Sequence, residues 1–308
     1  MYSGRKFDVD IDLGMEIFNT GLVRLNEISK RYNSNIYVKF EGYSLTGSHK
    51  DRESRYVTED AKVRGYSKIG CASTGNLAIS LSAYALKRNL ECHVWVSENI
   101  SGERLRLIKM FSPVIHRVGG DYLEAVLLSN SEMGKYEIYN ANPGECQGKI
   151  EGNSVIGYEI SKSLRPDVII CPTNNGSLLR GVWLGLNKMD IYPKMVAVIA
   201  MQTNLADSIY GFHGLDNPNE IIQESDGEIV DVSDSQIKKA CKDLFFEGIV
   251  SEPASASAVA ALGSLRDIRN KNICCIITGS GMKYTGGELY CDDEDSDTCK
   301  SYDLVLQR

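Results

Sequence analysis

The stretch Lys39–Arg52, which reads K-F-E-G-Y-S-L-T-G-S-H-K-D-R, decides the fold of this chain. It leads from a hydrophobic segment, residues 36–40, through a loop of small and hydroxyl side chains to Lys50 at the start of a predicted helix. The positive end of a helix dipole disfavours a second positive charge there. Such a lysine can lose its proton and act as a nucleophile, as in Schiff-base chemistry. The alternative is a solvated surface lysine, so the interpretation depends on the motifs downstream.

The composition of the chain excludes several classes of function. The chain has 308 residues, of which 43% are hydrophobic, which suits one large α/β unit or two lobes. A net charge of −7 without any run of lysine or arginine argues against nucleic-acid binding. No apolar run reaches the ~18 residues needed to span a bilayer, and residues 1–12 lack the apolar core of a signal peptide. We therefore expect a soluble, cytoplasmic protein that binds neither nucleic acid nor membrane.

The cysteines and histidines indicate no metal site. The chain has nine cysteines without a C-x-x-C pair, and its four histidines are dispersed. Buried free thiols are expected in the predicted strands, at Cys71, Cys92, Cys171, Cys274 and Cys275. Cys291 and Cys299 flank an acidic run, residues 292–295. A disulfide or metal site there stays open, although a solvated tail is the simpler interpretation.

Strands and helices alternate along most of the chain. Hydrophobic segments predict strands at residues 68–71, 92–95, 114–118, 137–141, 167–171, 195–200, 229–232 and 273–277, with helices between them. This order predicts an α/β fold with mostly parallel sheets and helices on both faces. Ser233, followed by Gln236 three residues later, forms a capping-box pattern that starts one of these helices. Ligands in such folds bind beyond the carboxyl ends of the strands.

Two loops of small polar residues follow predicted strands at that end and open helices. Ser73-Thr74-Gly75-Asn76 offers free N–H groups, hydroxyls and an amide, which suit a carboxylate; simple helix capping is the alternative. Residues 173–178, which read T-N-N-G-S-L, can hold a phosphate through successive N–H groups. They form no Walker loop, and an asparagine-rich turn is the alternative.

A third loop, residues 278–281, follows the last strong strand and reads T-G-S-G. The hydroxyl of Thr278 can bond a ring nitrogen without bringing charge, whereas a simple glycine turn is the alternative. One nucleophilic lysine, one carboxylate receptor, one phosphate cradle and one neutral hydroxyl together describe a site for pyridoxal phosphate and an amino acid. With Lys50, the three loops are expected to converge on one cleft.

These motifs resemble those of the fold-type II pyridoxal-phosphate enzymes, the family of the tryptophan synthase β subunit, and within it the threonine synthases. The matching pieces appear in family order between about residues 22 and 283: the Lys39–Arg52 stretch, C-A-S-T-G-N-L-A from Cys71, C-P-T-N-N-G-S-L-L-R-G-V-W from Cys171, S-E-P-A-S-A-S-A-V-A from Ser251 and I-I-T-G-S-G-M-K from Ile276. Leu77 departs from the pattern, because threonine synthases usually have threonine there.

The resemblance implies a role for each residue. Lys50 would carry the cofactor as an aldimine, Asn76 would bond its 3′-oxygen, and Thr278 would face its pyridine nitrogen. Ser73 and Thr74 would receive the substrate carboxylate. Asn142 would contact the substrate, and Lys149 falls where an arginine would hold the substrate phosphate, with a surface lysine as the alternative. The cofactor phosphate would lie on Asn174, Asn175, Gly176, Ser177 and Leu178.

The resemblance also implies the organisation and the reaction. Residues 1–52 and 142–308 would form a larger cofactor-binding domain, residues 53–141 a smaller one, and the protein would be a homodimer. The implied reaction converts O-phosphohomoserine and water to threonine and phosphate by γ-elimination and β-addition. The alternatives are cysteine synthase-like β-replacement, serine/threonine dehydratase-like β-elimination, and a non-catalytic amino-acid-binding protein.

Overall fold

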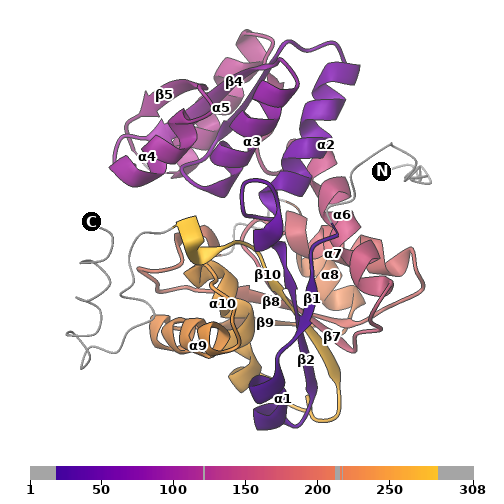
Figure 1. Ribbon diagram of the computed structural model, residues 1–308. Coiled ribbons are helices and arrows are strands. Elements are labelled where there is room, and N and C mark those ends of the chain that lie inside the picture. Colours follow the sequence, from indigo (N-terminus) through magenta and orange to yellow (C-terminus); the bar gives the residue numbers. More distant parts are fainter. Residues whose placement is uncertain (1–18, 121, 212–215, 217, 284–308) are drawn as a thin grey trace, which may run out of the picture.

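The chain folds into two sheets, each with helices packed against it (Figure 1). A computed structural model describes residues 19–120, 122–211, 216 and 218–283. The predicted α/β class is confirmed, since all but one of the strand pairs in these ranges are parallel. No helix within them is both long and apolar enough to cross a membrane. Cys291, Cys299 and residues 292–295 lie outside the described ranges.

The larger sheet has six strands in the order β1-β2-β10-β7-β8-β9. Their bounds are β1 (Leu22–Arg24), β2 (Asn35–Phe40), β10 (Asn272–Ile277), β7 (Val168–Pro172), β8 (Lys194–Ile199) and β9 (Glu228–Asp231). Only β1 is antiparallel to its neighbour, β2. The sequence does not predict β1, because its three residues are partly or fully exposed and show no buried pattern.

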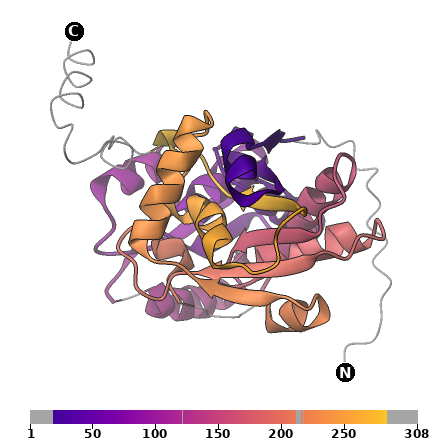
Figure 2. The same cartoon turned by 90° about the horizontal axis from the view of Figure 1, so that it is seen from below.

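Helices cover both faces of this sheet, as the view in Figure 2 also shows. On one face pack α1 (Asn26–Tyr32), α9 (Asp234–Phe246) and α10 (Pro253–Ala260). On the other pack α6 (Gly148–Ser161), α7 (Ser177–Asn187) and α8 (Pro218–Glu224). The predicted capping box at the start of α9 is confirmed, with both of its hydrogen bonds present.

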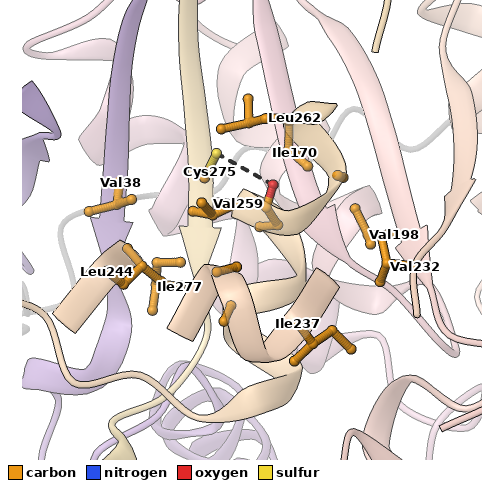
Figure 3. Close-up of a cluster of buried hydrophobic side chains, with 14 of the residues drawn as sticks. Val38, Ile170, Val198, Val232, Ile237, Leu244, Val259, Leu262, Cys275 and Ile277 are labelled. Atoms are coloured by element: carbon orange, nitrogen blue, oxygen red, sulfur yellow. Dashed lines mark hydrogen bonds between the residues drawn. The ribbon is translucent and has the colours of Figure 1, made fainter. Parts of the chain in front are cut away.

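Successive side chains of these strands point alternately into two buried hydrophobic clusters, one on each face of the sheet. In β7, Val168 and Ile170 join one buried cluster, whereas Ile169 and Cys171 join the other. Figure 3 shows the first cluster, in which the Cys275 thiol donates to the Ala258 carbonyl at 3.6 Å. The described cysteines are buried and free, which agrees with their prediction as core thiols.

The smaller sheet has four parallel strands in the order β5-β4-β3-β6. They are β5 (Val114–Val118), β4 (Glu91–Ser97), β3 (Lys68–Ala72) and β6 (Tyr139–Asn140). Val57 of α2 (Lys50–Val63), Leu81 of α3 (Asn76–Lys87) and Ile108 of α4 (Gly102–Lys109) pack on one face. Met133 of α5 (Tyr122–Lys135) packs on the other, beside Trp95.

Helix α2 runs from the larger sheet to the smaller one, and its first turn packs on α6. A Cβ atom at Gly152 of α6 would collide with the Arg52 carbonyl of α2, so only glycine permits this approach. Helix α6 in turn packs closely on the first half of α7, where a Cβ atom at Gly181 would collide with the Asn153 side chain and the Ile150 carbonyl of α6. The starts of α2, α6 and α7 are thereby held together, which positions the site described next.

Candidate active site

The structure brings the predicted loops together around the start of α2. The His49 amide donates to the Thr278 carbonyl at 2.8 Å, and Ser48 forms a β-bridge with Gly279. Ser177, at the start of α7, donates its hydroxyl to the Glu53 carboxylate at 3.4 Å. The sequence-predicted convergence of the Lys50, Thr278 and Ser177 segments is therefore present in the geometry.

Lys50 lies one helical turn from a buried carboxylate. Its ammonium donates to Glu53 Oε1 at 2.7 Å, and its side chain remains 23% exposed, whereas that of Glu53 is fully buried. Residues three apart on a helix share a face, so this contact follows from the start of α2 at Lys50. Lys50 is thus partly accessible from solvent and is held in place by its contact with Glu53.

Glu53 gathers donors from three helices. Asn153 of α6 donates to Oε1 at 2.9 Å, and His49 Nε2 lies 3.7 Å from the same oxygen. Lys149 lies 3.9 Å from Oε2, which has no hydrogen-bond partner in the described structure. Burial alone would raise the pKa of Glu53, but Lys50 and Lys149 outweigh it and lower the pKa to about 2. Glu53 is therefore ionised at neutral pH.

Lys149 is a buried cation. It is only 2% exposed, so the surface-lysine alternative is wrong. Burial lowers the pKa of Lys149, and the Glu53 carboxylate opposes that effect. The nearby Asp216 has its pKa raised by burial, and its Oδ2 has no partner among the described residues. The carboxyl groups of Glu53 and Asp216 thus both lie near Lys149.

The start of α7 has the geometry of an anion site. In the described structure, no acceptor pairs with the main-chain N–H groups of Asn175, Gly176, Ser177 and Leu178, and no side chain caps the helix. Gly176 adopts φ = 103°, which only glycine adopts without strain. Successive unpaired N–H groups at a helix start suit a phosphate. The residues therefore fit the phosphate group of the predicted cofactor.

Asn174 lies beside this anion site. Its side-chain amide donates to the Tyr210 carbonyl at 3.1 Å, while its Oδ1 is buried without a described partner. Asn175 likewise has a buried Oδ1 without a partner, and its carbonyl accepts from the Asp216 amide at 2.8 Å. Buried polar atoms without partners are rare in folded proteins and indicate a place for a ligand or water.

The start of α3 offers a second set of free donors. Gly75 is the N-cap residue and no side chain caps the helix, so the helix-capping alternative for Ser73 and Thr74 is wrong. The Ser73 hydroxyl instead accepts from the Gly75 amide at 3.2 Å. No acceptor in the described chain pairs with the N–H groups of Thr74, Asn76 and Leu77. This loop can therefore bind a carboxylate.

Asn76 belongs to a polar triad that the sequence does not predict. Its amide donates to Glu252 Oε2 at 2.9 Å, and its Oδ1 accepts from Lys283 at 2.6 Å. Lys283 also pairs with Glu252 at 2.9 Å. Glu252 lies within the S-E-P-A motif already singled out, so that motif was the available signal.

Thr278 and Asn142 are both held by neighbouring residues. The Thr278 hydroxyl lies 2.7 Å from the Ser255 hydroxyl, directly after β10. Asn142 is fully buried: its Nδ2 donates to Ser129 at 2.8 Å, and its Oδ1 accepts from the Ala72 amide at 2.7 Å. Asn142 thereby ties the end of β3 to α5, and its contact with a substrate stays a prediction.

No group of three or more histidine, cysteine or acidic side chains in the described part of the chain could hold a metal ion. The arrangement is instead that of a lysine held by Glu53, which also bonds the start of α7. Glu252 joins the start of α3 to the Thr278 loop, because it accepts from Asn76 and its amide donates to the Gly279 carbonyl at 3.1 Å. Such an arrangement can bind a ligand with a phosphate at one end and a carboxylate at the other, with the lysine amine between them.

Comparisons with known proteins agree with this geometry. A family model described as pyridoxal-phosphate dependent enzyme matches residues 13–279. Threonine synthase of Halalkalibacterium halodurans is 30% identical over 86% of this chain and 82% of its own length. Threonine synthase of Methanocaldococcus jannaschii is 29% identical over 89% of this chain and 77% of its own length.

Solved structures share the fold at lower identity. O-acetyl serine sulfhydrylase isoform 3 from Entamoeba histolytica has a TM-score of 0.79 and 19% identity, covering 95% of both chains. Threonine deaminase isoform 2 from Solanum lycopersicum has a TM-score of 0.76 and 20% identity, covering 89% of this chain and 88% of its own. Both likenesses concern the fold alone.

Fold and site together define a fold-type II enzyme that works with a phosphate-bearing cofactor. The chain belongs to the family of pyridoxal-phosphate-dependent enzymes. It is a pyridoxal-phosphate-dependent enzyme similar to the threonine synthases, as its sequence motifs predict.

Proposed function

We propose that the protein carries out threonine synthase-type chemistry: loss of a leaving group from the γ carbon of a homoserine derivative, followed by addition of water at the β carbon. The observation that carries this proposal is the position of Lys50. Its partner Glu53 also accepts from Ser177 at the start of α7, where the main-chain N–H groups are unpaired in the described structure. The similarity to threonine synthases over most of the chain favours this reaction among those of the family.

The proposal assigns a task to each part of the site. Pyridoxal phosphate, when bound, supplies an electrophilic carbonyl and an electron-withdrawing ring. Asn174 and the N–H groups of residues 175–178 would hold its phosphate, and Thr278 would face the ring nitrogen. Ser73 and Thr74 orient the substrate carboxylate. Lys50 holds the cofactor covalently between turnovers and moves protons at the α and β carbons of the substrate.

The direct test is product analysis with a set of substrates. The purified enzyme, loaded with pyridoxal phosphate, is incubated with O-phosphohomoserine, O-acetylhomoserine, homoserine, O-acetylserine, serine and threonine. We expect threonine from at least one homoserine derivative. Formation of 2-oxoacids from serine or threonine without any threonine synthesis would contradict the proposal.

A β-elimination reaction on serine or threonine is the second candidate. The observation that favours it is the Glu53 carboxylate, 3.9 Å from Lys149, because it already compensates the cation that would meet a substrate phosphate. A β-replacement of the cysteine synthase type would show as cysteine formed from O-acetylserine and sulfide. A non-catalytic binding protein would turn over none of these substrates, and the presence of Lys50 argues against it.

The organisation of the protein forms part of the same proposal. We take residues 1–52 and 142–308 as the cofactor-binding domain and residues 53–141 as the smaller one, with the boundary inside α2. A homodimer working in the cytoplasm completes the proposal. Light scattering of the purified protein measures the oligomeric state, and a monomer would contradict that part.

A further inference from the structure

Glu53 lies beside Lys149, the residue that the sequence resemblance places at the leaving group of the substrate. Its Oε2 faces Lys149 at 3.9 Å and has no hydrogen-bond partner among the described residues. Its Oε1 contacts Lys50 at 2.7 Å and Ser177 at 3.4 Å. The carboxylate therefore lies between the reactive lysine, the start of α7 and the buried cation.

Glu53 and Lys149 form a pair that solvent does not reach, since both side chains are at most 2% exposed. Lys50, the other lysine beside Glu53, holds the cofactor in the proposed function and is therefore not free to bind a second anion. Burial alone would raise the pKa of Glu53, but Lys50 and Lys149 lower it, so the carboxylate is ionised where it faces Lys149. A dianionic phosphate at Lys149 would then lie beside a buried carboxylate, and like charges in a buried site repel strongly.

We propose that Glu53 is a specificity-determining residue: it pairs with Lys149 and thereby selects substrates whose leaving group is uncharged, such as an acyl ester or a hydroxyl, over a phosphate ester. This inference rests on the proposed function and names its class of substrate. Lys149 then serves as the counter-ion of Glu53 and does not bind the leaving group.

The reaction with an acyl ester balances without any co-reactant except water. O-acetylhomoserine and water give threonine and acetate. The Cγ–O bond breaks, and acetate leaves with the electron pair. One proton moves from Cβ to Cγ, the oxygen of water bonds to Cβ, and the remaining proton of that water is released.

The test compares O-acetylhomoserine with O-phosphohomoserine in wild type and in Glu53→Gln. Glutamine keeps the shape and a carbonyl acceptor for Asn153 and Ser177 but removes the charge. We expect wild type to have the higher kcat/KM for the acetyl ester. The variant should shift the ratio of the two kcat/KM values about 10- to 100-fold toward the phosphate ester, as expected for one charge-assisted contact. An unchanged ratio, or a wild type that prefers the phosphate ester, would overturn the proposal.

Two further variants connect the effect to the ion pair. Lys149→Met in the Glu53→Gln background should abolish the gain for the phosphate ester, because the uncompensated cation is then gone. Glu53→Asp keeps the charge and should keep the wild-type preference. Glu252→Gln, which alters a buried carboxylate beside Asn76, is the matched control and should leave the ratio unchanged. A Glu252→Gln shift as large as that of Glu53→Gln would contradict a specific role of Glu53.

A binding measurement separates this inference from the proposed reaction. Inorganic phosphate is titrated into the cofactor-loaded enzyme while the absorbance of the cofactor is followed. We expect saturable binding to Glu53→Gln, at least about tenfold tighter than to wild type. Equal phosphate affinities would overturn the role of Glu53, whether or not threonine is formed. If neither ester gives threonine but the affinities differ as expected, the proposed reaction fails and the role of Glu53 stands.

Discussion

Two neighbouring residues of α2, Arg52 and Glu53, enter two buried charge clusters of different character. In the Arg52 cluster, which consists of Lys39, Glu41, Arg52 and Glu159, each carboxylate oxygen accepts at least one hydrogen bond. Arg52 donates to Glu159 Oε2 at 2.7 Å, and Lys39 donates to the same oxygen at 2.6 Å. The cluster has two cations and two anions, and every carboxylate charge is satisfied.

The Glu53 cluster, which consists of His49, Lys50, Glu53 and Lys149, is only partly satisfied. Lys50, Asn153 and Ser177 all donate to Oε1 of Glu53, while Oε2 has no hydrogen-bond partner among the described residues. A fully bonded buried network fixes the fold, whereas an unsatisfied buried polar atom calls for an explanation and is frequent at functional sites. Adjacent residues of one helix thus belong to a structural cluster and to the candidate active site.

Replacement of Lys50 should have the largest effect on activity. Lys50→Ala removes the amine that holds the cofactor, so borohydride should no longer fix cofactor on the protein, and turnover should fall by roughly a thousandfold or more. The variant should stay folded, because Lys50 is the partly exposed member of the Glu53 cluster. Mass spectrometry of borohydride-treated protein gives the readout. Lys62→Ala, an exposed lysine of the same helix, is the control, and loss of fixation there would point to unfolding instead.

Breaking the Arg52 cluster should have the next largest effect, on stability. Arg52→Met leaves the Glu41 and Glu159 carboxylates buried without their main partner, which is expected to lower the free energy of unfolding by about 3–5 kcal/mol. Urea denaturation followed by circular dichroism measures this loss. The matched control is Arg64→Met, which breaks an exposed pair with Asp60 and should change stability by about 0–1 kcal/mol. Equal losses in both variants would show that the Arg52 cluster is not structural.

The sequence predicts the positions of the strands and helices better than it predicts how deeply their side chains are buried. Hydrophobic segments place most strands within two residues of their observed ends, because strands of a parallel sheet with helices on both faces are buried along nearly their whole length. β1 is missed, because its exposed pairing with β2 leaves no such pattern. Glu53 could have been placed on the face of Lys50 by the helical period alone. Its burial could not, because it depends on the approach of α6 at Gly152, as does the burial of Lys149.

The smallest of these effects should appear in the acid stability of the protein. Glu53 has its pKa lowered from 4.5 to about 2 by Lys50 and Lys149 against the effect of burial, so its folded-state charge stabilises the protein above the unfolded pKa. That contribution is lost as the pH falls from about 4.5 toward 2, and its size is on the order of 3 kcal/mol.

Glu53→Gln has no such charge, so its stability should fall less steeply than that of wild type over this pH window. Urea denaturation at several pH values compares the two slopes, and the exposed Glu59→Gln provides a control that should follow wild type.

His49 also contributes to the acid stability, since burial and the charge of Lys50 lower its pKa to about 4. Its neutral folded form loses stability relative to the unfolded state as the pH falls from about 6.5 to 4. Glu53→Gln should keep the onset of this loss near pH 6.5 but lower the pKa of His49 further, because the Glu53 charge raises that pKa. Parallel curves for wild type and Glu53→Gln below pH 4.5 would mean that Glu53 is not held as an anion, and the contrast between the two clusters would then disappear.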